Sequence, residues 1–138
     1  MAAGFVEQAG AAAQRGLMKW ITGEERARAA GERHEAIRMA GAFHLHLAAH
    51  AGNTTLERVL REAVTRTSLV LMRYGPQEVR EAGGCDCHEH RAIAAALKLR
   101  DKAAAGRLLL RHLDRLEGQL GFDAPARAAP RLADVLAA

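Results

Sequence analysis

Three stretches of the sequence carry apolar or small side chains at helical spacing, and each contains one histidine at an inward-facing position. The stretches cover about residues 32–51, 87–99 and 101–120, and their apolar residues recur every three or four positions. This spacing is typical of a helix that buries one face. The histidines within these faces are His44, His90 and His112. A chain with this pattern is expected to bring three imidazoles into the core of one helical bundle.

The composition also predicts a helical protein. Of the 138 residues, 49% are hydrophobic but only 4% are aromatic, and three are prolines. Alanine is abundant, and no segment alternates apolar and polar residues as a half-buried strand does. We therefore predict an all-α fold, an antiparallel bundle of five to six helices with short connections, built as one domain over residues 1–138.

Glycines, a proline and capping residues set the expected helix ends. Gly16 is expected to end a first helix over residues 2–15. Residues 22–25, Thr-Gly-Glu-Glu, match a capping box that would open a short charged helix ending near Gly31. The later helices are expected over about residues 32–51, 54–74, 87–99 and 101–120. Gly-Pro at 75–76 stops the long helix, because proline cannot continue it.

The charge and hydropathy patterns argue against nucleic-acid and membrane partners. The net charge is +4, and the 20 basic and 16 acidic residues are interspersed, without a run of five or six like charges. No window approaches 18 uninterrupted apolar residues, the length that would span a membrane. The residues after Met1 lack the basic and apolar regions of a signal peptide. We therefore expect a cytoplasmic protein.

The three inward-facing histidines suggest a metal site. A lone histidine on an apolar helix face is usually a core residue whose ring nitrogens have partners. Three of them, on three helices, cost several kcal/mol to bury unless all of their nitrogens find partners. One shared metal ion would satisfy the three rings together, and neutral imidazole suits zinc, nickel, copper or iron.

The other potential ligands form weaker patterns. His46 and His50 are four residues apart, a spacing that can chelate a metal from one helix, but they lie away from His44 and are expected on a solvated or interface face. Cys85 and Cys87 could be metal ligands or two free thiols in a reducing compartment. With His90 they form a Cys-x-Cys-x-x-His cluster that lacks a fourth protein ligand in that segment.

Several short motifs between Gly31 and Leu120 together carry a family resemblance. In chain order they are Phe43-His44, Ala51-Gly52-Asn53, Glu89-His90 with Ile93 and Leu97, Asp101, Ala104 and His112-Leu113. Their order and spacing resemble the FCD domain, the effector-sensing C-terminal domain of GntR-family bacterial transcription regulators of the FadR subfamily. Residues 1–30 would then form a partly atypical start, and residues 122–138 a C-terminal tail.

The resemblance implies an all-helical domain that dimerises and senses a small effector, often a carboxylic acid. Many FCD domains hold a divalent transition metal, for which we expect zinc or nickel here, with one aspartate and three histidines. Carried over to this sequence, the histidines are His44, His90 and His112, and the aspartate position is Ala40, which cannot ligate. Three protein ligands and one open position are a coordination that zinc accepts. The open position beside Ala40 would favour direct binding of a carboxylate effector.

Two residues of the long helix are further candidates for effector contact. Arg66 and Thr67 could bind the acid, although a salt bridge at the surface is the alternative for Arg66. Regulators of this family also carry an N-terminal winged helix-turn-helix, and nothing before Gly31 is long enough to be one. We therefore expect a homodimer that does not itself read DNA, either an excised sensor domain or a stand-alone homologue.

Two other functions use the same residues. One is a metal-dependent, hydrolase-like enzyme with the three histidines as its centre. It lacks a base in the sequence pattern, since Glu89 is adjacent to His90 and is expected to point elsewhere on the helix. The other is a purely structural dimerisation module. We expect a regulatory domain rather than an enzyme.

Overall fold

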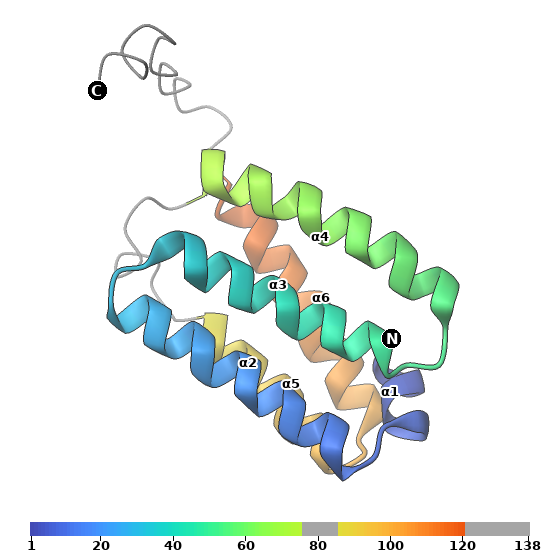
Figure 1. Cartoon of the computed structure of the whole chain (residues 1–138). Helices are drawn as coiled ribbons and strands as arrows, with labels where there is room; N and C mark the ends of the chain where they lie inside the picture. Colours follow the sequence, from blue (N-terminus) through green and yellow to red (C-terminus); the bar gives the residue numbers. More distant parts are fainter. Residues whose placement is uncertain (76–85, 121–138) are drawn as a thin grey trace, which may run out of the picture.

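The computed structural model describes residues 1–75 and 86–120, with the side chains of residues 86 and 87 left out, and forms a bundle of helices (Figure 1). The helices are α1 (Ala2–Gln8), α2 (Ala11–Ala29), α3 (Arg33–Ala49), α4 (Thr54–Tyr74), α5 (Asp86–Lys98) and α6 (Lys102–Gly118). No strand occurs in these two ranges, which confirms the predicted all-α class. None of the described helices is both long and apolar enough to cross a membrane.

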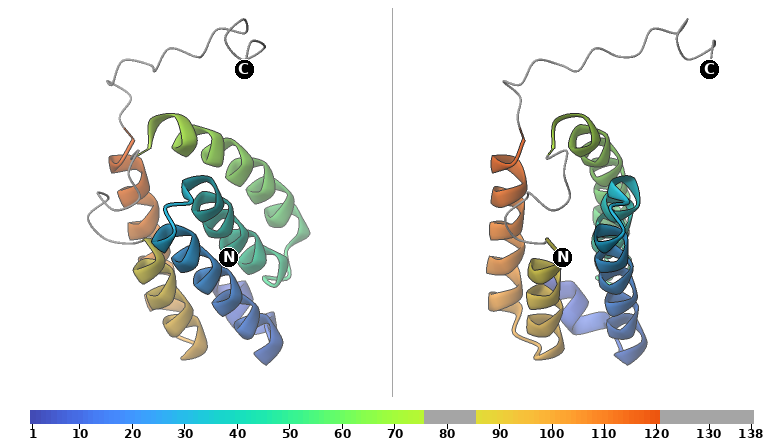
Figure 2. Two further views of the ribbon diagram at one scale, coloured as in Figure 1. Left: turned by 60° about the vertical axis from the view of Figure 1, so that its left-hand side comes forward. Right: turned by 90° about the vertical axis from the view of Figure 1, so that its left-hand side faces the viewer.

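The helices form two layers, which Figure 2 shows edge-on in its right-hand view. One layer consists of α2, α3 and α4, and the other of α5 and α6, while α1 closes one end between them. Helix α2 packs against both α3 and α5 and so joins the layers. Helix α4 has α3 as its only neighbouring helix within the described residues. The bundle is therefore tightly joined around α2, α3, α5 and α6 and open beside α4.

The core lies between the two layers and is made almost entirely of aliphatic and phenylalanine side chains. Its largest fully buried apolar members are Phe5, Leu17, Ile21, Phe43, Leu47, Ile93 and Leu97. Helix α4 contributes no buried residue to it. Among the described residues, three polar side chains are nonetheless buried with them, namely Glu24, His90 and His112. Because buried polar groups need hydrogen-bond partners, these three side chains must bond to one another, to other residues or to a ligand.

The predicted break at Gly16 and the predicted capping box at residues 22–25 are both wrong. Helix α2 runs without interruption from Ala11 to Ala29, and the chain turns earlier, at the extended residues Ala9 and Gly10. Gly16 serves a helix contact instead, because a Cβ atom there would lie 2.3 Å from Cε1 of His46 on α3. A glycine that admits a neighbouring ring has the same appearance in the sequence as one that ends a helix.

The predicted starts of α4 and α6 are confirmed by their caps. The side chain of Asn53 accepts a hydrogen bond from the amide of Leu56 at 2.9 Å, and that of Asp101 from the amide of Ala104 at 2.8 Å. Gly52, which follows α3, has a φ of 69°, a left-handed conformation that glycine adopts without steric cost. Residues 76–85, which include Cys85, and the expected tail over 122–138 lie outside the described residues.

Candidate metal centre and effector cavity

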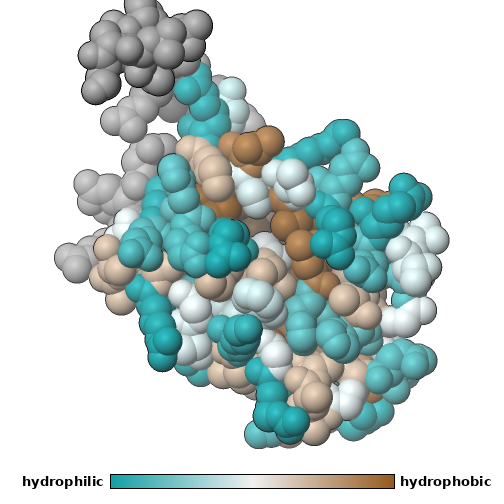
Figure 3. Space-filling model, in the orientation of Figure 1, coloured by the Kyte–Doolittle hydropathy of each residue, from teal (hydrophilic) through white to brown (hydrophobic). Residues whose placement is uncertain are grey.

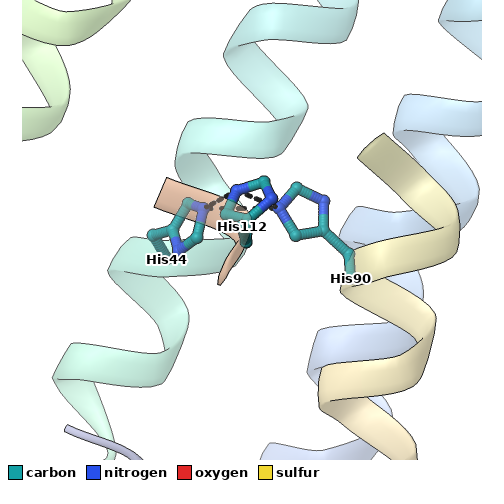
Figure 4. Close-up of side chains that lie close together, drawn as sticks. All are labelled: His44, His90 and His112. Carbon is teal, nitrogen blue, oxygen red and sulfur yellow. Dashed lines mark hydrogen bonds between the residues drawn. The ribbon is translucent and has the colours of Figure 1, made fainter. Parts of the chain in front are cut away.

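The three inward-facing histidines meet at one point. His44 comes from α3, His90 from α5 and His112 from α6, and their rings point toward one another (Figure 4). The three Nε2 atoms form a nearly equilateral triangle, with separations of 3.2, 3.3 and 3.3 Å. Three different helices thus place one nitrogen each at a common centre.

The triangle has the dimensions of one face of a metal coordination sphere. Zinc binds histidine nitrogen at about 2.0–2.1 Å, so two ligands of a tetrahedral ion lie about 3.3–3.4 Å apart. The separations of 3.2–3.3 Å between the Nε2 atoms agree with this spacing. The residues present therefore fit a tetrahedral ion with three protein ligands and one further position.

Hydrogen bonds on the outer side of two rings determine which nitrogen carries the proton. His90 donates from Nδ1 to Oε2 of Glu24 at 2.7 Å, and His112 donates from Nδ1 to Oε2 of Glu89 at 2.9 Å. An ionised carboxylate only accepts hydrogen bonds, so each Nδ1 holds the proton and each neutral ring presents a lone pair at Nε2. Two lone pairs 3.3 Å apart repel each other unless a cation lies between them. This carboxylate–histidine arrangement is the usual outer shell of a metal-binding histidine.

Glu24 is the more enclosed of the two carboxylates. Its side chain is fully buried, and its other oxygen, Oε1, accepts hydrogen bonds from Nε and Nη2 of Arg28 at 3.0 and 2.8 Å. Burial raises the pKa of Glu24, but the hydrogen bonds and charges of His90 and Arg28 outweigh it and hold the pKa below its usual value. Glu24 is therefore a carboxylate anion in the core, and Arg28, Glu24 and His90 form a chain that ends at the metal position.

Glu89 makes the equivalent chain on the other side of the centre. Its Oε1 accepts from Nη1 of Arg115 at 3.0 Å while its Oε2 holds His112, and its side chain is 25% exposed. Burial raises its pKa, and the bonds to His112 and Arg115 lower it by more. The expectation that Glu89 points away from the histidines is thus wrong. Consecutive helical residues diverge by about 100°, which directs His90 toward α2 and Glu89 toward α6.

His44 completes the centre in a neutral form. Burial lowers its pKa well below the usual range, and the nearby rings of His90 and His112 lower it further. Phe43 packs edge-on against His44, with ring centroids 5.3 Å apart, and lies 4.3 Å from the centroid of His90. A metal requires the neutral imidazole, so this environment favours the binding form.

A cavity of about 340 Å³ opens from the histidine triangle between α3, α4 and α6. Ala40 and Thr67, two of the predicted effector residues, lie in its wall. Arg66, the third, does not line it, because its side chain points outward, is 77% exposed and pairs with Glu62. Two arginines that no sequence pattern indicates, Arg28 and Arg33, line the cavity instead.

The predicted cap at residues 22–25 conceals the roles of Glu24 and Arg28, because it places Glu24 at a helix end. The uninterrupted α2 instead places Glu24 and Arg28 one turn apart on the same face. Arg33 begins α3 and donates from Nη1 to the carbonyl of Met72 at 3.1 Å and from Nη2 to that of Leu71 at 2.5 Å. It therefore contributes positive charge where α4 ends.

The remaining histidines lie apart from the centre. His46 donates from Nε2 to the carbonyl of Ala13 on α2 at 2.7 Å, and His50 bonds through Nδ1 to the carbonyl of His46 at 2.9 Å. Both rings are half-buried, that of His46 against α2 and that of His50 near Phe5 of α1. His88 is exposed. Among the described residues, only His44, His90 and His112 form a group with the spacing of metal ligands.

In a comparison against protein families, the FCD domain matches residues 1–115. The chain belongs to the FCD domain family. FCD domains are effector-binding domains of GntR-type regulators, and they bind small molecules. The match includes α1 and α2, which precede the motifs that carry the resemblance in the sequence. Searches of curated proteins and of solved structures returned no significant match.

Proposed function

We propose that this FCD domain is the effector-sensing and dimerisation domain of a GntR-family transcription regulator. It binds a small carboxylic acid beside a divalent metal, zinc or nickel, held by His44, His90 and His112. It acts in the cytoplasm as a homodimer and reaches DNA only through a winged helix-turn-helix. The observation that carries the proposal is the triangle of Nε2 atoms, 3.2–3.3 Å apart, at the inner end of a cavity.

The cavity has the charge that an acid requires. Its charged lining side chains in the described ranges are Arg28 and Arg33, and none of its lining residues is acidic. A divalent ion at the triangle would add positive charge at its inner end. Ala40, one turn before His44, leaves a coordination position without a protein ligand, which a carboxylate oxygen or water would fill. The protein residues bind and orient the metal, and the metal supplies a point of attachment for the acid.

The acid would act by shifting a conformational equilibrium. It touches residues of α3, α4 and α6 at once, and α4 is the helix with the fewest neighbours. Binding would favour the arrangement in which these helices enclose the acid. In a dimeric regulator the changed helix arrangement would alter the spacing of the two DNA-binding heads.

A hydrolytic enzyme built on the same centre has less support. Glu24 and Glu89 are the nearby carboxylates, and each is bonded to the Nδ1 side of a ring, opposite the Nε2 atoms. Both therefore orient ligands, and neither occupies the place of a base beside a metal-bound water.

Metal analysis of the purified chain tests the proposal. We expect about one zinc or nickel ion per chain, lost in His112→Ala and in His90→Ala. Two control variants remove histidines outside the triangle: His88→Ala on α5 and His50→Ala at the end of α3. Both should retain the metal. A wild-type chain without metal that also takes up none from a zinc or nickel solution would contradict the metal site.

The open position has a test of its own. Ala40→Asp should tighten metal binding by adding a fourth ligand and weaken binding of acetate by occupying the open position. Thermal-shift measurements with and without zinc and acetate separate the two effects. A purely structural module would instead tolerate leucine at all three histidines and show no stabilisation by any acid.

A further inference from the structure

The wall of the cavity formed by α4 is mostly apolar and is not covered by another described helix. Leu60, Val64 and Leu71 line the cavity from this helix, yet none of the residues of α4 is buried. Helix α4 packs on α3 and on no other described helix. Within the described residues, no other helix therefore packs against the cavity-facing side chains of α4.

The opposite wall, formed by α6, is apolar in the same way. Leu113 and Leu116 line it, and Leu113 is 54% exposed. Figure 3 shows exposed apolar side chains gathered in the hollow beside α4, with hydrophilic residues around them. Large apolar side chains that face each other across a cavity are a binding surface more often than an accident of packing.

Polar residues also line the cavity, among them Thr67 and Ser68 on the α4 wall itself. The histidine triangle lies at the inner end, with Arg28 beside it through the bond to Glu24. Arg33 lies at the end of α4, where its guanidinium donates to backbone carbonyls of the last turn. The partial negative charge of a helix C-terminus compensates such a cation. With a divalent ion at the triangle, the inner end of the cavity would be cationic, since the charge of Arg28 is already balanced by Glu24, while Leu60, Val64, Leu113 and Leu116 make the walls beside it apolar.

We propose that the effector is an amphipathic monocarboxylic acid, with its carboxylate at the open metal position and its apolar tail between α4 and α6. The position of the carboxylate rests on the proposed function, whereas the tail is inferred from the two apolar walls. The tail covers Leu60, Val64 and Leu113 and joins α4 to the layer of α5 and α6. A short diacid or hydroxy acid would leave these side chains in water. A second carboxylate on a longer acid would lose its hydration against them.

A matched set of acids and one alcohol tests the tail. The probes are acetate, octanoate, suberate and octanol, titrated into the zinc-loaded or cobalt-loaded full chain by calorimetry. Acetate has the carboxylate without the tail, suberate adds a second carboxylate at the same chain length, and octanol has the tail without the acid. Octanoate is expected to bind at least tenfold more tightly than each of the other three. The visible spectrum of the cobalt form should respond to both acetate and octanoate.

Two leucines of α6 form a matched pair of variants. Leu113 lines the cavity and Leu110 does not, and they are 54% and 64% exposed, so neither substitution removes a core residue. Leu113→Gln should weaken octanoate roughly tenfold, the effect of one or two methylene groups left in water, without changing acetate. Leu110→Gln should change neither.

The outcomes separate the tail from the site itself. If acetate or suberate binds as tightly as octanoate, or Leu113→Gln weakens acetate equally, the apolar tail is wrong while the metal site stands. If octanol binds as tightly as octanoate, the cavity is a nonspecific apolar surface that does not recognise the carboxylate. That result would also contradict the inference. If the chain binds neither cobalt nor zinc, the metal site of the proposed function is wrong, whatever the affinity for octanoate.

Discussion

Two adjacent glutamates of α2 bind two adjacent residues of α5. One of these pairs is buried and the other is exposed to solvent. Glu24 binds His90, and both side chains are fully buried. Glu25 binds Nε and Nη2 of Arg91 at 2.5 and 2.7 Å, and these side chains are 30% and 47% exposed. The same two helices are thus bridged twice, once at the histidine triangle and once at the surface.

The difference shows that environment decides what an ion pair contributes. The surface pair competes with water and loses side-chain entropy, so such pairs contribute about 0–1 kcal/mol. The buried pair cannot exchange its partner for water, and removal of one member leaves the other desolvated. We therefore expect Glu24 to affect folding and metal binding, and Glu25 to affect neither strongly.

The largest expected effect is that of Glu24→Ala on stability. The substitution removes the acceptor of both His90 and Arg28 inside the core. Loss of one member of a buried ionic group costs about 3–5 kcal/mol. Chemical denaturation of the metal-free chain measures this change, with Glu25→Ala as the control at a cost below about 1 kcal/mol. If Glu24→Ala and Glu25→Ala lose the same free energy of unfolding, burial does not determine the contribution of these ion pairs.

The next effect concerns metal affinity in Glu24→Gln, which nearly preserves the shape of the side chain. A glutamine can still accept from Nδ1 of His90, but it lacks the charge that makes the ring a stronger ligand. Changes in such outer carboxylates weaken metal binding about 10–100-fold. Competition with a zinc chelator measures the affinity, and circular dichroism checks the fold. Glu25→Gln is the matched control. If the two variants bind zinc with equal affinity, Glu24 does not support the metal site.

The sequence predicts the helical fold and the three ring positions because both follow from periodicity. His44, His90 and His112 replace apolar residues in regular stripes, so burial and convergence can be read from spacing. The outer carboxylates depend on which helices become neighbours. Glu24 meets His90 across 66 residues, and no local pattern encodes that contact. The role of Gly16 likewise depends on a distant contact, the ring of His46 on α3, which no local pattern encodes.

A smaller loss of metal affinity is expected for Glu89→Gln. Glu89 supports His112 as Glu24 supports His90, but it is 25% exposed, so water can reach the site and bond to Nδ1 in its place. We expect an affinity several-fold below wild type and above that of Glu24→Gln. The same chelator competition measures it. If Glu89→Gln is the weaker binder of the two, exposure is not what distinguishes these carboxylates.

The smallest effect is the pH dependence contributed by Glu25. The hydrogen bond from Arg91 lowers the pKa of Glu25 below its usual value, and burial only partly opposes this shift. A lowered pKa stabilises the fold above the usual pKa of glutamate, and this contribution disappears as the pH falls through the lowered value. The free energy of unfolding of Glu25→Gln should therefore lie about 0.2–1 kcal/mol below wild type at pH 7 and converge with it in acid.

Salt provides a second check on the same variant, because the Glu25–Arg91 pair is exposed to solvent. At about 1 M ionic strength the screening length falls to about 3 Å, so the difference between Glu25→Gln and wild type at pH 7 should shrink. The stability loss of Glu24→Ala should persist under the same conditions, because ions do not enter the core around His90. A loss in Glu24→Ala that disappears with salt would place Glu24 in contact with solvent and remove the contrast between the two glutamates.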